Sequence, residues 1–156
     1  MSKSAPDASS RIVLTDSPAQ IASKLKRAVT DGESSLSYEP ERRPAVGNLL
    51  LVLATLRNRS RKLDLTQGEA GDITPAQLAE ELNRQSGSSG KGAAATLKAA
   101  VTEAVIDALA PVQRELVRLQ ADPAYLLEVE RKGRDKARER AAQTLAEVRR
   151  VIGFEQ

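Results

Sequence analysis

Apolar residues recur at the helical repeat over the last third of the chain, and this pattern constrains the fold most strongly. The first run consists of Leu97, Val101, Val105, Leu109, Val112, Leu116 and Leu119. Steps of three and four place these side chains on one face of a helix. A second run follows Asp122-Pro123 and consists of Leu126, Val129, Gly133, Ala137, Ala141, Leu145, Val148 and Ile152. The spacing predicts two long antiparallel helices, and Pro111 is expected to kink the first.

Start signals upstream predict three shorter helices. Ser17-Pro-Ala-Gln20 and Thr74-Pro-Ala-Gln77 each have the sequence of a capping box with proline at the first helical position. A further helix is expected from Pro44, and its apolar residues are not confined to one stripe, so it should be buried on most sides. The serine- and glycine-rich stretch 86–92 is expected to be a flexible connector.

The predicted fold class is all-α, a helical bundle of about five helices with a short N-terminal strand. Aromatic residues make up only 2% of the chain, so the core must be aliphatic, which favours helices packed on helices. The strand is expected at Arg11–Thr15, where β-branched and aliphatic residues follow one another. Nothing else in the chain resembles a partner strand, so we expect its sheet to lie upstream.

Composition also limits the chemistry of the chain. There is no cysteine and no histidine, which excludes disulfides, thiolate or imidazole metal ligands and histidine acid–base catalysis. The formal charge of +3 is compatible with a nucleic-acid partner. No apolar run approaches the ~20 residues of a membrane span, and no signal peptide is expected at the start.

The first four residues introduce a resemblance. Met1-Ser-Lys-Ser4 resembles the Lys-Met-Ser-Lys-Ser signature of class I aminoacyl-tRNA synthetases, without its leading lysine. Six further segments are similar, in order, to tryptophanyl-tRNA synthetases. They are Leu14–Asp16, Ala28–Asp31, Arg43–Leu50, Leu109–Val112, Gly133–Arg138 and Val151–Phe154. The stretch from Arg57 to Lys91 departs from the family pattern and looks like an insertion.

The resemblance implies two regions with different roles. Residues 1–16 would be the catalytic-loop remnant and end of a nucleotide-binding domain, in which Met1, Ser2, Lys3 and Ser4 bind ATP. Lys3 would be catalytic, because a cation there stabilises the charge that builds on the departing pyrophosphate. Residues 17–156 would be the helical region that binds the tRNA anticodon, and its basic candidates are Arg131, Lys132, Arg134, Lys136 and Arg138.

The resemblance also implies what the chain lacks. The family's other signature, His-Ile-Gly-His, and its Rossmann-type sheet lie upstream, and this chain has no histidine. The intact enzyme would join tryptophan to tRNA(Trp) with ATP and Mg²⁺, act as a homodimer and work in the mitochondrial matrix or otherwise the cytoplasm. The chain alone is expected to be an inactive fragment of it.

Two other interpretations stay open from the residues alone. The chain could be a free-standing helical module that binds RNA, or an adaptor that binds proteins through its apolar seams. From Glu128 to Arg150 the chain has eight basic and five acidic residues. The same pattern could be a solvated helix face with ion pairs at four-residue spacing.

Overall fold

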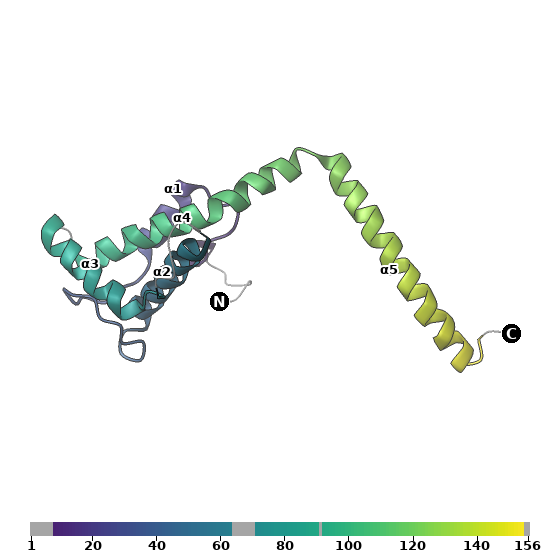
Figure 1. Ribbon diagram of the computed structural model, residues 1–156, viewed down its shortest axis with the longest axis horizontal. Helices are drawn as coiled ribbons and strands as arrows, with labels where there is room; N and C mark the ends of the chain where they lie inside the picture. Colours follow the sequence, from purple (N-terminus) through teal and green to yellow (C-terminus); the bar gives the residue numbers. More distant parts are fainter. Residues whose placement is uncertain (1–7, 64–70, 91, 155–156) are drawn as a thin grey trace. The chain divides into compact units, whose positions relative to one another are not determined.

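The computed structural model describes residues 8–63, 71–90 and 92–154, and in these residues every regular element is helical. The elements are η1 (Ala8–Ser10), α1 (Pro18–Arg27), α2 (Pro44–Leu63), α3 (Pro75–Ser89), α4 (Ala93–Gln120) and α5 (Pro123–Val151) (Figure 1). The chain forms two compact units, Met1–Gln113 and Arg114–Gln156. The predicted all-α class is confirmed. Within the described residues, no helix has the length and apolarity that crossing a bilayer requires.

Both predicted capping boxes form. The Ser17 hydroxyl accepts from the Gln20 backbone amide at 3.3 Å, and the Gln20 side chain accepts from the Ser17 amide at 2.8 Å. Thr74 and Gln77 make the same reciprocal pair at 3.2 and 2.9 Å. Each box satisfies amide groups that a helix N-terminus otherwise leaves without partners. The starts of α1 and α3 are therefore set by local sequence.

The predicted strand at Arg11–Thr15 is wrong, because these residues lead into a turn. The Val13 amide donates to the Asp16 carboxylate at 2.9 Å, and the Asp16 amide donates to the Val13 carbonyl at 3.0 Å. An aspartate side chain that bonds its own backbone neighbourhood competes with strand pairing. The preference of β-branched residues for strands was therefore outweighed by one polar residue, Asp16, directly after the run.

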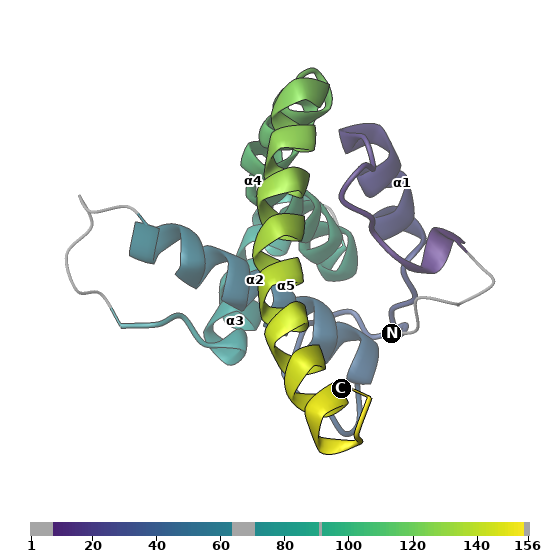
Figure 2. The same cartoon turned by 90° about the vertical axis from the view of Figure 1, so that its right-hand side faces the viewer.

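The first unit has an aliphatic core to which all four of its helices contribute. Leu50 and Leu53 of α2 are completely buried. In Figure 2, α4 runs between α1 on one side and α2 with α3 on the other. The buried hydrophobic residues are Ile21, Leu25, Leu36, Val46, Leu49, Leu50, Leu53, Ala54, Leu78, Ala79, Leu82, Ala93, Leu97 and Val101. Six residues of α2 are buried, but Asn48, Leu51 and Thr55 form an exposed face at helical spacing, so the prediction that α2 is buried on most sides is not confirmed.

Helix α3 extends further than the sequence suggests. The helix runs to Ser89 and ends at Gly90, which has a left-handed φ of 66°. The Ser86 and Ser88 hydroxyls donate back to the carbonyls of Asn83 and Arg84, at 2.9 and 3.3 Å. The predicted flexible connector is therefore wrong for residues 86–89. The stretch predicted as an insertion contributes Leu78, Ala79 and Leu82 to the core, so it is not a peripheral addition.

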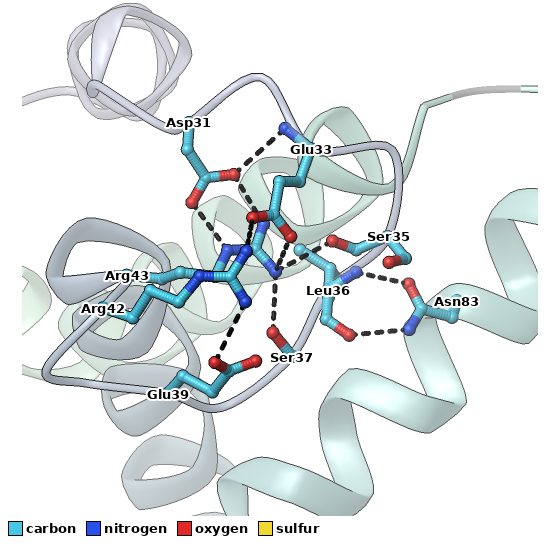
Figure 3. Close-up of polar contacts among 9 residues, drawn as sticks. All are labelled: Asp31, Glu33, Ser35, Leu36, Ser37, Glu39, Arg42, Arg43 and Asn83. Carbon is cyan, nitrogen blue, oxygen red and sulfur yellow. Dashed lines mark hydrogen bonds and ion pairs between the residues drawn. The ribbon is translucent and has the colours of Figure 1, made fainter.

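A buried arginine organises the loop between α1 and α2 (Figure 3). Arg43 is only 3% exposed, and its guanidinium grips the Asp31 carboxylate with two bonds, Nε–Oδ2 at 2.7 Å and Nη2–Oδ1 at 2.5 Å. It also donates to the Ser35 carbonyl at 3.0 Å and the Ser37 hydroxyl at 2.8 Å. A bidentate pair of this kind fixes direction as well as distance. The loop is thereby bound to the residue that precedes α2.

Two asparagine side chains each bind a loop to a helix by accepting one hydrogen bond from a backbone residue and donating one to the same residue. Asn83 of α3 accepts from the Leu36 amide at 2.7 Å and donates to the Leu36 carbonyl at 2.8 Å. Asn58 of α2 does the same for Ile73, at 2.8 and 2.9 Å. Each amide satisfies one backbone donor and one backbone acceptor that would otherwise be left without a partner near the core.

The second unit contains the end of α4 and the whole of α5. No residue of α5 is buried, and the large apolar residues of its predicted inner face (Leu126, Val129, Leu145, Val148 and Ile152) are between 44% and 58% exposed. Within the second unit this face is uncovered, and its packing against another part of the chain stays a prediction. The predicted stop at Gly153 is confirmed: its φ is 76°, and the Phe154 amide donates to the Arg149 carbonyl at 2.9 Å. Helix α4 continues through Pro111, and the kink stays a prediction.

We predict that Leu50→Ala destabilises the first unit strongly and Leu51→Ala does not. Leu50 is fully buried, whereas its neighbour Leu51 is 48% exposed. Truncating a buried leucine costs about 2–5 kcal/mol, and surface changes cost about 0.5 kcal/mol. Urea unfolding of the two variants gives the comparison directly. Similar losses of unfolding free energy in both would contradict the assigned core.

We also predict that the Asp31–Arg43 pair contributes stability at neutral pH that is lost in acid. The hydrogen bonds from Arg43 lower the pKa of Asp31 below its ordinary value of 3.8. A carboxyl whose pKa is lower in the folded state stabilises the fold above the ordinary value, and the effect disappears as the pH falls through the folded-state pKa. Asp31→Asn should therefore lower the thermal midpoint at pH 7 and differ less from the wild type near pH 3. The exposed Asp107→Asn is the control. A deficit of Asp31→Asn that is the same at both pH values would refute the role of the pair.

Candidate functional site

The structure describes one of the two sets of predicted site residues. Met1, Ser2, Lys3 and Ser4 lie outside the described residues. The five predicted RNA-binding residues all lie in the middle part of α5. This helix starts at a cap where the Asp122 carboxylate accepts from the Tyr125 amide at 3.0 Å. They are Arg131, Lys132, Arg134, Lys136 and Arg138, and each is exposed. The candidate RNA surface is defined here as these five side chains.

Helical spacing divides the candidate RNA surface into two rows. Arg131, Arg134 and Arg138 are three and four positions apart, so they share one face of α5. Lys132 and Lys136 are four positions apart and share a second face. The arginine row spans about 10 Å along the axis. Since this is about one Debye length at 0.1 M salt, its charges act together on a nearby phosphate.

Most of the charges on this surface are available to a partner. Lys132 pairs with Glu128 at 2.7 Å, and Arg134 pairs with Asp135 at 3.3 Å. Within the described residues, no ion pair engages Arg131, Lys136 or Arg138. Exposed pairs of this kind contribute ~0–1 kcal/mol, so a phosphate can replace the acidic partner at small cost. Among these five residues, only Lys132 forms the ion pair at four-residue spacing that the alternative of a solvated helix face predicts, because Asp135 is the direct neighbour of Arg134.

A contact missed by sequence reasoning crosses the break between α4 and α5. The Arg118 guanidinium lies over the Tyr125 ring, 5.8 Å from its centre, and also binds Glu115 at 2.7 Å. Tyr125 is 44% exposed. Its ring is thus held by a cation on one face. The spacing of three residues between Glu115 and Arg118 could have predicted their ion pair. It could not have predicted the contact of Arg118 with Tyr125, which lies beyond Asp122-Pro123.

The stretch just before α1 forms a turn of residues 13–16, called here the 13–16 turn. Asp16 is 5% exposed, and its carboxylate binds Lys24 of α1 at 2.5 Å as well as the Val13 amide. Both bonds lower the pKa of Asp16, and the bond from Lys24 has the larger effect. From α4, the Gln113 side chain donates to the Leu14 and Asp16 carbonyls, both at 2.9 Å. Sequence reasoning missed Lys24, which is 8 residues from Asp16, and Gln113, which is 99 residues from Leu14.

Comparison with known proteins gives a consistent set of similarities. A family model described as "tRNA synthetases class I (W and Y)" matches residues 1–107. The tryptophan–tRNA ligase of Nostoc sp. is 36% identical over 154 residues, which are 99% of this chain and 40% of that protein. The tryptophan–tRNA ligase of Caulobacter vibrioides is 38% identical over 156 residues, which are 99% of this chain and 39% of that protein.

A solved structure extends the similarity to the fold. The crystal structure of tryptophanyl-tRNA synthetase from Mycoplasma pneumoniae has a TM-score of 0.69 and 27% identity, over 98% of this chain and 40% of that chain. The chain therefore spans about 40% of the length of the relatives that it matches. The three organisms named are bacteria, and they give no support to a mitochondrial form.

Proposed function

Because the chain belongs to the class I tRNA synthetases for tryptophan and tyrosine, we propose that it is part of a tryptophan–tRNA ligase. Such an enzyme activates tryptophan with ATP and transfers it to tRNA(Trp). One observation carries this proposal: tryptophan–tRNA ligases are similar to 99% of the chain, from the first loop to α5. Since those relatives are about two and a half times as long, the chain alone is expected to lack the activity.

In the proposed activation step, residues 1–4 contact the phosphates of ATP. A carboxylate oxygen of tryptophan bonds to the α-phosphorus, the bond from that phosphorus to the bridging oxygen breaks, and pyrophosphate leaves. Lys3 stabilises the negative charge that grows on the departing group, and Ser2 and Ser4 can donate hydroxyl bonds to it. A cation that acts on charge present only in the transition state raises kcat more than it tightens substrate binding.

Magnesium would accompany ATP in the intact enzyme. The described residues contain no group of three or more carboxylates able to hold a metal ion. The ion can be bound by the nucleotide phosphates themselves. A homodimeric state and a location in the cytoplasm remain predictions for the whole protein.

The second proposed role is binding of the tRNA(Trp) anticodon by α5. Three features support it: the arginine row lies on one face, three of the five basic side chains make no ion pair within the described residues, and the helix buries none of its residues. Arginine can bind phosphate and also stack on unpaired bases, which is how single-stranded RNA is usually read. The Tyr125 ring at the start of α5 adds one exposed aromatic surface.

A helical adaptor that binds proteins is the alternative with an observation in its favour. The exposed apolar face of α5, with Leu145 and Val148, fits such a role. The two functions respond oppositely to salt, because phosphate contacts weaken steeply as salt rises and apolar contacts do not. Salt-insensitive binding of a protein, without binding of tRNA, would favour the adaptor.

We predict that Lys3→Ala slows adenylate formation far more than it weakens tryptophan binding. The test uses a chimeric synthetase in which residues 1–156 replace the matching part of the Caulobacter vibrioides relative. Pyrophosphate exchange should show a fall in kcat of at least about a hundredfold, the usual size for one lost transition-state contact, with little change in the KM for tryptophan. Equal losses in both would contradict the role of Lys3.

We predict that removing charge from the arginine row weakens tRNA(Trp) binding more than the same change elsewhere on α5. Arg134→Gln with Arg138→Gln is compared with Arg149→Gln with Arg150→Gln, so both variants lose two positive charges from one helix. The first pair should reduce the slope of log affinity against log salt by about 1.4–1.8. Equal effects of the two pairs would mean that net charge, and not the candidate RNA surface, governs binding.

A further inference from the structure

The aromatic ring at the start of α5 has one face occupied and much of its surface exposed. The Arg118 guanidinium lies over one face of the Tyr125 ring, 5.8 Å from its centre. Within the described residues, no second cation and no other aromatic ring lies over it. Because Tyr125 is 44% exposed, the second unit leaves ring surface on which another planar group can lie.

The position of this ring is set by contacts within the second unit. The Glu115 carboxylate accepts from Arg118 Nε at 3.0 Å and from Nη2 at 2.7 Å, which orients the guanidinium. The Tyr125 amide donates to the Asp122 carboxylate at 3.0 Å, which fixes the backbone that carries the ring. A ring positioned in advance loses less conformational freedom when a partner stacks on it.

Two cations follow the ring along the same face of α5. Lys132 is seven positions after Tyr125 and Lys136 is four positions further, and this spacing places the three residues on one face. The two lysines lie roughly 10 and 16 Å from Tyr125 along the helix axis. Lys136 makes no ion pair within the described residues, and Lys132 has only the exposed pair with Glu128. Single-stranded nucleic acids are bound by this combination, in which bases stack on rings and phosphates meet cations.

We propose that Tyr125 is a stacking subsite for an unpaired RNA base. The base lies on the ring face opposite Arg118, and the strand continues toward Lys132 and Lys136. This inference rests on the proposed binding of the tRNA(Trp) anticodon by α5, and it names the side chain that takes a base. Arg118 holds the ring and draws its π electrons away from the base. The subsite accepts any base, because every base has a planar face.

A purely structural role for the ring makes a different prediction. In that role, Tyr125 only holds the start of α5 to the end of α4 through Arg118. Loss of the ring would then weaken binding of an RNA to the same extent whether or not its loop carries bases. A stacking subsite predicts that the ring matters only when a base is present.

The composition of the chain provides a reporter and matched controls. The chain has no tryptophan, so Tyr125→Trp places a single indole at the subsite. Tyr125→Leu removes the ring but keeps an apolar side chain, and Tyr125→Phe keeps the ring and loses only the hydroxyl. Phe154 is an exposed aromatic residue of the same unit, so Phe154→Trp and Phe154→Leu are the controls.

The first test adds the anticodon stem-loop of tRNA(Trp) to the 156-residue chain and measures fluorescence. A base that stacks on the indole should quench the fluorescence of Tyr125→Trp. A stem-loop with abasic loop nucleotides should leave it unchanged, and Phe154→Trp should respond to neither RNA. No quenching by the intact loop, or equal quenching by the two RNAs, would overturn the proposal.

The second test measures the affinity for the same two RNAs. Tyr125→Leu should bind the intact stem-loop about tenfold more weakly, a loss within the range for one stacked base. Its salt dependence should be unchanged, because no charge is lost. Lys132→Gln with Lys136→Gln should instead reduce the slope of log affinity against log salt by about 1.4. Tyr125→Phe and Phe154→Leu should bind like the wild type.

The abasic stem-loop separates failure of the subsite from failure of the proposed function. Tyr125→Leu should bind this RNA as the wild type does. An equal loss of affinity for both RNAs, or no loss for either, would overturn the stacking subsite and leave RNA binding by α5 in place. A wild-type chain that binds neither RNA at low salt would defeat the proposed function of α5 itself.

Discussion

The first unit depends on one interaction, the burial of aliphatic side chains around α2. The chain has no cysteine, no histidine and almost no aromatic residues, so neither disulfides nor large rings can supply cohesion. Leu50 and Leu53 are fully buried among residues of α1, α3 and α4. Since the hydrophobic effect is proportional to area and has no direction, it collects the helices but does not orient the loops between them.

The loops are oriented by polar side chains that each replace a missing backbone partner. Arg43 holds Asp31, and Asn58 and Asn83 bind Ile73 and Leu36. Gln113 follows the same principle at the 13–16 turn but donates twice. Such contacts are individually modest in net free energy but costly to leave unmade near a core. They give the helical unit defined loop positions.

The sequence predicted the features whose conformation depends on neighbouring residues, and it failed for features whose conformation depends on residues far away in the chain. The caps at Ser17 and Thr74, the stop at Gly153 and the aliphatic core were all readable from short patterns. The strand at Arg11–Thr15 was not, because the Asp16 side chain and the distant Gln113 satisfy the backbone there instead of a second strand. The apolar stripe of α5 correctly indicated a helix, but a pattern shows which face is apolar and not what covers it. In the candidate site, the two basic rows on α5 could be predicted from residue spacing. The contacts of Lys24, Arg118 and Gln113 became visible only in the three-dimensional structure.

We propose that this chain supplies an RNA-binding helix and a phosphate-binding loop to a synthetase, and that it is inactive without the other residues of the active site. The most direct test assays the purified 156-residue chain for binding of tRNA(Trp) and for tryptophan-dependent pyrophosphate exchange in the same preparation. The account predicts tRNA binding that weakens steeply with salt and no exchange. Measurable exchange, or the absence of any tRNA binding at low salt, would contradict it.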